Sequence, residues 1–263
     1  MHRYLGPDPQ SELARIRARE PEWLALADEV ASFSGGLINS LVVPHANMQL
    51  FLAAILLRRI VGCLEAVLLL AERGMHTEGL TMRRALLEAL FILGAVRNQP
   101  SLVETYLAMD NHLRRDIFKN LKKLGAKRIQ ALAPEFTPEM IDKTIAALEK
   151  EAKATSYLGP DRFAQAAKLY DLYLTDYSFL SEAAHHAGKD LERNIATNEN
   201  NEVDGLYWGP EENPPSDLLY PALDQTLMAA SIAMKLFKIA IPAQLKSLVK
   251  QLNELRNPKG NSS

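Results

Sequence analysis

The chain has 263 residues, of which 48% are hydrophobic and 24% charged, values typical of a globular protein. Its formal net charge of -2 argues against a protein that is basic overall, so any binding to nucleic acid would depend on a local patch. The single cysteine, Cys63, cannot form an internal disulfide and fits a reducing cytoplasm. The N-terminal residues contain no apolar stretch after their charges, so we expect no signal peptide.

Proline, glycine and capping residues divide the sequence into a series of predicted helices, with almost no strand alternation. Ser101 and Glu104 have the spacing of a capping box, and the helix that ends near His186 is expected to kink near Thr175. The expected helices, with approximate bounds, are 11–19, 21–43, 46–73, 77–98, 101–124, 137–153, 161–186, 216–241 and 242–256. The helix that begins at Pro21 should weaken at Gly35 and Gly36.

Two stretches, residues 50–70 and 85–96, are apolar on most of their circumference. Helices of this kind belong in the middle of a bundle. The first stretch is long enough to suggest a membrane span, but Arg58, Arg59 and Glu65 interrupt it near its middle. We therefore predict two central core helices and no membrane segment.

Residues 188–217 differ from the rest, because they combine asparagine, glycine and proline with several acids. Two short stretches, Glu192–Thr197 and Val203–Trp208, flank the turn sequence NENNE and predict a small hairpin. The fold class predicted for the chain is all-α, an up-down bundle of roughly eight helices with an acidic loop or hairpin near 188–217. We expect one domain over residues 1–256, with its core at about 45–241, and a disordered tail over 257–263.

Arg84 and Glu88 stand four residues apart in the helix predicted over 77–98, so they share one face and can pair with each other. Thr81 lies on the same face, one turn earlier. Charge in a core, or at its edge, is costly unless it is paired. The pair is either a bridge to a neighbouring helix or a site for an anionic ligand or a catalytic step, since arginine is a forked donor suited to phosphate.

A second set of polar residues occurs near the end of the helix predicted over 161–186. Tyr177, Ser181 and His185 are spaced at i, i+4 and i+8, so two hydroxyls and an imidazole line one surface. His185 and His186 point to different sides of a helix, and we expect no metal site. The imidazoles are either satisfied in the interior or at the helix end, or they serve acid–base chemistry near neutral pH.

Basic residues gather in the second half of the helix predicted over 101–124. They are Arg114, Arg115, Lys119, Lys122 and Lys123, and only Asp116 dilutes their charge. Such a patch can hold a phosphate backbone, but Phe118 is the one aromatic residue among them, so base stacking is not indicated. The alternative is an ordinary solvated helix face.

The order of the predicted helices and motifs along the chain also resembles that of a known family. A long apolar helix is followed by TMRRALLEALF, then by a charged helix, and later by YSFLSEAAHH. This order resembles a widespread bacterial family of helical proteins of unknown function. Its R-x-L-L-E helix matches Arg84 to Glu88, its later L-S-x-x-x-H element matches Leu180 to His185, and the resemblance covers about residues 45–240.

That architecture is similar in turn to the HEPN class of helical bundles, many of which are ribonucleases in toxin–antitoxin and phage-defence systems. The resemblance implies a homodimer whose facing helices build a shared, metal-free cleft. In that cleft arginine stabilises phosphate charge, and histidine acts on the ribose hydroxyl or the leaving oxygen. The usual R-x(4–6)-H signature of that class is absent here, so Arg84 and His185 have to meet through folding.

These observations lead to the prediction of a HEPN-like intracellular defence or toxin-type protein, a metal-independent ribonuclease without a cofactor. Its predicted cleft contains Arg84, Glu88, Tyr177, Ser181 and His185. In it, Arg84 would hold the phosphate, His185 would shuttle a proton and Glu88 would orient one of them. The expected partners are a second copy of the chain and an RNA or a protein, such as an antitoxin or a defence component, in the cytoplasm and away from membranes.

The alternative comes from a different class of protein, a non-catalytic interaction or regulatory module. In that case the same polar residues tie the bundle together, and the acidic segment 188–217 contacts a partner. The positions of the Arg84 guanidinium and the His185 ring separate the two hypotheses. Convergence of both groups on one solvent-reachable point favours catalysis, whereas either group sealed in the core with satisfied hydrogen bonds favours a scaffold.

Overall fold

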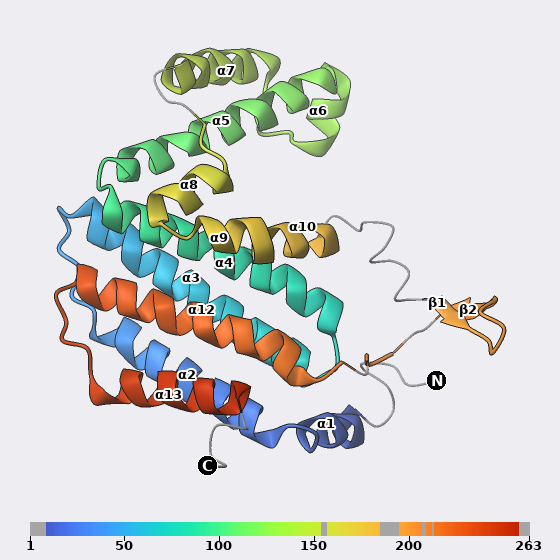
Figure 1. Ribbon diagram of the computed structural model, residues 1–263. Coiled ribbons are helices and arrows are strands. Elements are labelled where there is room, and N and C mark those ends of the chain that lie inside the picture. Colours follow the sequence, from blue (N-terminus) through green and yellow to red (C-terminus); the bar gives the residue numbers. More distant parts are fainter. Residues whose placement is uncertain (1–8, 154–156, 185–194, 207–208, 212, 258–263) are drawn as a thin grey trace.

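The computed structural model describes residues 9–153, 157–184, 195–206, 209–211 and 213–257 (Figure 1). Helices make up 77% of these described residues, and a single short hairpin supplies the strands among them. The predicted all-α class is therefore confirmed. Among the described helices, none is long and apolar enough to cross a membrane.

The described residues 9–153 form seven helices. Their bounds are α1 Pro9–Arg17, α2 Pro21–Ser40, α3 Met48–Ala71, α4 His76–Asn98, α5 Leu102–Lys123, α6 Ala126–Leu132 and α7 Pro138–Lys153. Most of the predicted bounds are correct to within two residues, because caps and prolines mark them. The Asn47 side chain accepts from the Leu50 N–H at the start of α3, and the Thr137 hydroxyl accepts from the Met140 N–H at the start of α7.

The second half is more broken than the sequence predicts. Its elements are α8 Pro160–Ala167, α9 Tyr170–Leu172, the π-helix η1 Tyr173–Tyr177, α10 Ser178–Ala184, α12 Pro215–Leu236 and α13 Ala243–Arg256. The single helix predicted over 161–186 ends at Lys168, which has a left-handed φ of 61° and closes α8. With α9, η1 and α10 taken as one continuous helix, the described residues form eleven helices rather than roughly eight.

Helix α4 occupies the centre of the molecule, as the sequence predicts. It packs against α3, α8, α10 and α12, and the side chains of Leu86, Leu87, Leu90 and Phe91 have no exposed surface. Gly94 allows α8 to approach closely, since a Cβ atom there would lie 2.8 Å from the Cβ of Ala167. The centre of the fold is therefore set by the apolar run in α4.

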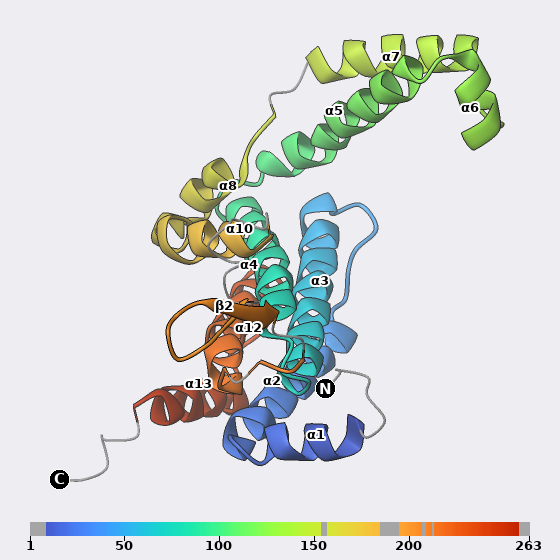
Figure 2. The same cartoon turned by 90° about the vertical axis from the view of Figure 1, so that its right-hand side faces the viewer.

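Helix α3 departs in part from the prediction of a central core helix. It packs against α4, α12 and α2, but an outer strip of it stays exposed. Figure 2 shows α3 at the edge of the bundle, next to α4. The prediction is wrong in this respect because three neighbouring helices cover only part of its circumference.

Helices α5, α6 and α7 form an arm that stands away from the other helices (Figure 2). Helix α7 packs along α5, and the rings of Phe118 and Phe136 meet edge-on with centroids 5.5 Å apart. The capping box predicted at Ser101 does not form, because Ser101 has helical backbone angles and its side chain caps nothing. Since the arm lies outside the stack of α2, α3, α4 and α12, the predicted up-down bundle is not confirmed.

The hairpin predicted near residues 192–208 is present over a shorter span. Strand β1, Ile195–Thr197, pairs antiparallel with β2, Val203–Leu206. The Asn198 carboxamide oxygen accepts from the backbone N–H groups of Asn200 and Glu202 and closes the turn. The flanking residues 192–194 and 207–208 lie outside the described residues.

Candidate functional site

Arg84 and Glu88 of α4 meet the hydroxyl of Tyr177, which comes from η1. Arg84 Nη2 donates to Tyr177 Oη at 2.9 Å, and Tyr177 Oη donates to Glu88 Oε1 at 2.7 Å. Arg84 Nη2 and Glu88 Oε1 are also 3.4 Å apart, so the predicted i, i+4 pair forms. We call these three residues the Arg84 cluster.

The Arg84 cluster lies at the boundary between core and solvent. The side chains of Arg84 and Glu88 are 21% and 39% exposed, whereas Tyr177 is only 7% exposed. The guanidinium carbon of Arg84 lies 5.1 Å from the centre of the Tyr177 ring, within the range of a cation–π contact. A buried phenol therefore holds two charged groups that water reaches.

The π-helix explains how Tyr177 reaches α4. In η1 the extra residue per turn brings Tyr173 and Tyr177 into a stack, with ring centroids 5.1 Å apart and an interplanar angle of 18°. Phe91 of α4 packs against Tyr177, with centroids 6.1 Å apart. The aromatic contacts fix the ring, and the hydroxyl is left to point at Arg84 and Glu88.

Burial sets the protonation state of the Tyr177 hydroxyl. Desolvation raises the pKa of Tyr177, the hydrogen bond from Arg84 lowers it, and the neighbouring Glu88 carboxylate raises it again. The net direction is upward, so the phenol keeps its proton at neutral pH. It can then donate to Glu88 while it accepts from Arg84.

A second polar cluster lies beside the first, and the sequence reasoning missed it. Arg83 Nη2 donates to Asp176 Oδ2 at 2.9 Å, and Gln225 Nε2 of α12 donates to the same oxygen at 2.8 Å. We call these three residues the Asp176 cluster. It joins α4, η1 and α12 through one carboxylate.

The Asp176 cluster is more deeply buried than the Arg84 cluster. The Arg83 side chain is 5% exposed, and desolvation lowers its pKa while Asp176 opposes that shift. A signal for this burial was present in the sequence. Arg83 lies three residues after Leu80 and four before Leu87, on the same face of α4, and both leucines are fully or almost fully buried.

The remaining residues of the predicted cleft do not join the Arg84 cluster. The Ser181 hydroxyl donates to the backbone carbonyl of Tyr177 at 2.8 Å, one turn back in its own helix. His185 and His186 lie outside the described residues. The structure therefore brings together Arg84, Glu88 and Tyr177 and leaves the predicted role of His185 as a prediction.

The predicted basic patch lies on the arm and faces acidic side chains of α7. Lys119 Nζ and Lys122 Nζ are each 2.6 Å from a carboxylate oxygen, of Glu149 and Asp142 respectively. On α5 itself, Arg115 pairs with Asp116 at 2.8 Å, Arg114 is 4.0 Å from Asp110, and Lys123 donates to Asn120 at 3.1 Å. These partners reduce the charge that the patch offers to a phosphate backbone, and the sequence reasoning did not identify those on α7.

A metal site finds no support in the described part of the chain, where no three histidine, cysteine or acidic side chains gather as ligands. Cys63 lies buried in α3, and burial raises the pKa of its thiol, although Arg59 partly opposes the shift. A thiolate nucleophile is disfavoured there.

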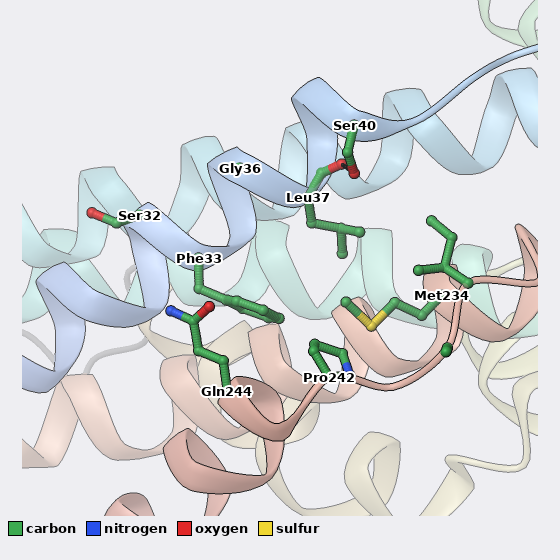
Figure 3. Close-up of a pocket in the computed structure, with 10 residues that line it drawn as sticks. Ser32, Phe33, Gly36, Leu37, Ser40, Met234, Pro242 and Gln244 are labelled. Carbon is green, nitrogen blue, oxygen red and sulfur yellow. Dashed lines mark hydrogen bonds between the residues drawn. The ribbon is translucent and has the colours of Figure 1, made fainter.

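Two further grooves, both mostly apolar, are lined by described residues elsewhere in the structure. One, of about 400 Å³, lies between α2 and the end of α12, and Figure 3 shows Phe33, Leu37 and Met234 on its walls. The other, of about 520 Å³, lies between α12 and α13 and includes Asp224, Lys235 and Lys246 among its lining residues. Neither groove contains a residue of the Arg84 cluster or the Asp176 cluster.

The fold and the two clusters define an all-helical protein in which two consecutive arginines of the central helix α4 bind side chains of a π-helix. Arg83 binds the Asp176 carboxylate, and Arg84 binds the Tyr177 hydroxyl. Residues 50–203 match the model of a family of unknown function, DUF5677, and the chain belongs to that family. The matched span contains α4 and η1 and therefore both arginines with their tyrosine and aspartate partners. Searches of curated proteins and of solved structures give no significant match.

The family match confirms one part of the resemblance inferred from the sequence, namely membership of a helical family of unknown function. It begins five residues later than the predicted span of about 45–240 and ends earlier, before α12. The similarity to the HEPN class and the bacterial distribution stay predictions.

Proposed function

We propose that this chain is a HEPN-like ribonuclease of a defence or toxin–antitoxin system, and that it cleaves RNA at the Arg84 cluster without a metal ion or cofactor. The observation that carries the proposal is the joint hydrogen bonding of Arg84 and Glu88 to the Tyr177 hydroxyl, at a place that water reaches. A π-helix at the same position adds support, because π-helices occur frequently at functional sites.

The chemistry of RNA cleavage assigns roles to these groups. The ribose 2′-oxygen attacks phosphorus as its proton passes to a base, and the bond from phosphorus to the 5′-oxygen breaks as that oxygen takes up a proton. The products are a cyclic phosphate and a free 5′-hydroxyl. Arg84 holds the phosphate oxygens with its forked donors, Glu88 orients Arg84 through their contact, and His185 transfers the proton.

In this proposal the protein acts in the cytoplasm as a homodimer, with RNA as its substrate and an antitoxin or other defence component as its protein partner. The free cysteine, Cys63, suits a reducing compartment. Helix α5 contributes the cations of its basic residues to the RNA path, although several of them already contact carboxylates.

The test is RNA cleavage by the purified chain in the presence of a chelator, with growth arrest on expression as a second readout. Arg84→Lys keeps a positive charge but loses the fork, and we expect it to lower the cleavage rate by about 100-fold. His185→Ala should lower the rate by at least as much. Cleavage at the wild-type rate by both variants would exclude this site.

A matched control comes from the same helix. Arg97 of α4 is exposed, and its guanidinium donates to the neighbouring Asn98 side chain, so Arg97→Lys should cleave RNA as the wild type does. A wild-type chain that cleaves no RNA and arrests no growth would contradict the proposal.

One observation favours the second candidate, a non-catalytic interaction module. The polar groups of the Arg84 cluster bind one another and tie α4 to η1, which is what a structural bridge does. The hairpin of β1 and β2 also presents exposed Val203 and Leu206 next to Asp204 and projects from the helices (Figure 1). In that case deletion of the hairpin would abolish binding of a partner protein, and Arg84→Lys would not.

A further inference from the structure

The larger of the two grooves, between α12 and α13, has the size of a binding site for a slender molecule. Its volume of about 520 Å³ lies within the range of about 300–1,000 Å³ that small-molecule sites occupy. The α12 residues that line it share one face of the helix, and they are Asp224, Leu227, Met228, Ser231, Ile232 and Lys235. At a rise of 1.5 Å per residue, this face is about 16 Å long. We call this site the α12–α13 groove.

The second wall of the α12–α13 groove comes from the start of α13 and the loop before it. Ile241, Leu245 and Val249 add apolar side chains to those of α12. Helix α13 packs against α12 (Figure 1), and Ile241 and Val249 still remain 39% and 41% exposed. Two helices therefore present apolar side chains to one channel that is open to solvent.

Positive charge gathers at one end of the α12–α13 groove. Lys235 lies in the last turn of α12 and Lys246 in the first turn of α13, on either side of the connecting loop. Within the part of the chain that the structure describes, neither lysine takes part in an ion pair or a side-chain hydrogen bond. Two ammonium groups therefore lie beside an apolar channel, and no described carboxylate neutralises them.

The opposite end of the α12–α13 groove carries Asp224. Desolvation raises the pKa of the Asp224 carboxyl, the Arg256 guanidinium opposes that shift, and the Asp176 carboxylate adds to it. Arg256 in turn lies over the ring of Tyr220, with its guanidinium carbon 4.7 Å from the ring centre. A carboxylate and a guanidinium balance each other at this end, so the groove is positive at the loop and close to neutral at the far end.

We infer that the α12–α13 groove binds a free fatty acid, with the carboxylate held by Lys235 and Lys246 and the acyl chain extended toward Asp224. An extended acyl chain of about ten to fourteen carbons has the length of the groove. The charges also set the orientation of the ligand. The reverse orientation would place its carboxylate beside that of Asp224, and like charges repel.

Charge complementarity and the chemistry of the walls favour a fatty acid over a segment of a partner protein. The walls offer apolar side chains along their length and cations at one end, which matches a ligand with one long apolar part and one anionic end. An extended peptide would bring backbone N–H and C=O groups against walls that cannot satisfy them. A helix is about 10 Å across, too wide for a groove of this volume.

The fatty-acid site goes beyond the proposed ribonuclease activity and does not depend on it. The test is calorimetric titration of the full chain with decanoate, dodecanoate and tetradecanoate, each below the concentration at which it forms micelles. We expect one dodecanoate to bind per chain, with a Kd on the order of 10–100 µM. Because the groove is open on one side, each two further CH₂ groups should strengthen binding by about 4-fold. No binding of dodecanoate, or equal affinity for the three chain lengths, would overturn the inference.

Neutralisation of the lysines tests the contact with the carboxylate. The double variant Lys235→Gln, Lys246→Gln should bind dodecanoate about 10-fold more weakly than the wild type does. Dodecanol, which has no charge, should bind equally to both proteins. Lys250→Gln is the matched control on α13, because Lys250 pairs with Glu254 and does not line the groove. Equal affinity of the double variant and this control for dodecanoate would contradict the inference.

A bulky side chain in the middle of the α12–α13 groove tests its place. Ser231 is half-buried and lines the groove, so Ser231→Phe should block the acyl chain and abolish binding of dodecanoate. The lysine variants change exposed residues alone, so they test the site even if Ser231→Phe fails to fold. Sedimentation of the chain without ligand tests a different occupant. A dimer that Ser231→Phe dissociates would assign the groove to a second copy and overturn the inference.

Discussion

Arg83 and Arg84 are consecutive residues of α4, but their side chains have different surroundings. Arg83 points into the interior and meets Asp176 and Gln225, with 5% of its side chain exposed. Arg84 points to the boundary and meets Tyr177 and Glu88, with 21% exposed. The 100° step between successive helical residues alone gives the two guanidinium groups these different positions.

The comparison separates a structural arginine from a candidate functional one. A buried guanidinium is stable only while its carboxylate partner stays in place, and Arg83 shows this in a pKa that burial lowers. Arg84 keeps contact with water, so a phosphate can approach it without unfolding the core. Substitution of Arg83 should therefore lower the stability of the fold, whereas substitution of Arg84 should lower the rate of RNA cleavage.

The largest effect on stability is expected for Arg83→Met. Removal of the guanidinium leaves the Asp176 carboxylate without its cation, and the free energy of unfolding should fall by about 3 kcal/mol. Urea denaturation followed by circular dichroism measures the change. Arg97→Met on the exposed end of α4 is the control, with a change below about 0.5 kcal/mol. If Arg83→Met is as stable as this control, the proposed structural role of the Asp176 cluster is contradicted.

A smaller effect is expected for Tyr177→Phe. The ring keeps its stack with Tyr173 and Phe91, and only the hydroxyl between Arg84 and Glu88 is lost. The unfolding free energy should fall by about 1 kcal/mol, the typical net contribution of such a hydrogen bond. Tyr170→Phe, at the other end of the tyrosine stack, serves as the control. A loss of unfolding free energy as large as that of Arg83→Met would show that the Arg84 cluster contributes as much to stability as the Asp176 cluster does.

The pH dependence of stability gives a subtler test of the same hydroxyl. Burial raises the pKa of Tyr177 above the value of about 10 that an unfolded chain shows. The unfolded chain then loses its proton first, so the stability present below pH 10 declines as the pH rises through the folded pKa. Tyr177→Phe should flatten this decline, and Tyr106, whose pKa burial also raises, should account for part of the remainder. An unchanged decline in the variant would contradict the burial of the Tyr177 hydroxyl.

The smallest effect is expected on the arm. Lys119 and Glu149 are both about 40% exposed, and water and salt screen an ion pair of this kind. Lys119→Met should change the unfolding free energy by no more than about 0.5 kcal/mol. If it lowers RNA binding as well, the lysine contributes to the phosphate path despite its carboxylate partner.

The helical architecture was predictable because local signals mark it. Pro21 begins α2, Asn47 caps α3 and Thr137 caps α7, and each acts within a few residues of its own position. The break at Lys168 was not predictable, because a left-handed lysine has no distinctive sequence signal. The exposed strip of α3 was missed for another reason, since apolar composition does not reveal how many neighbours a helix has.

The candidate site was predictable in part. The i, i+4 spacing of Arg84 and Glu88 predicts their pairing, and in the structure the Tyr177 hydroxyl is hydrogen-bonded to both residues. The role of Arg83 was missed, although its spacing from Leu80 and Leu87 places it on a buried face. Asp176 and Gln225 could not be assigned to it from sequence, because they are 93 and 142 residues away along the chain.

The most direct test compares RNA cleavage per folded molecule for Arg83→Met and Arg84→Met. Both variants lose one guanidinium from the same turn of α4, so each serves as the control for the other. The account predicts that Arg83→Met is less stable but cleaves RNA at the wild-type rate while folded, whereas Arg84→Met stays stable and loses about 100-fold in rate. Wild-type cleavage by folded Arg84→Met would contradict the account.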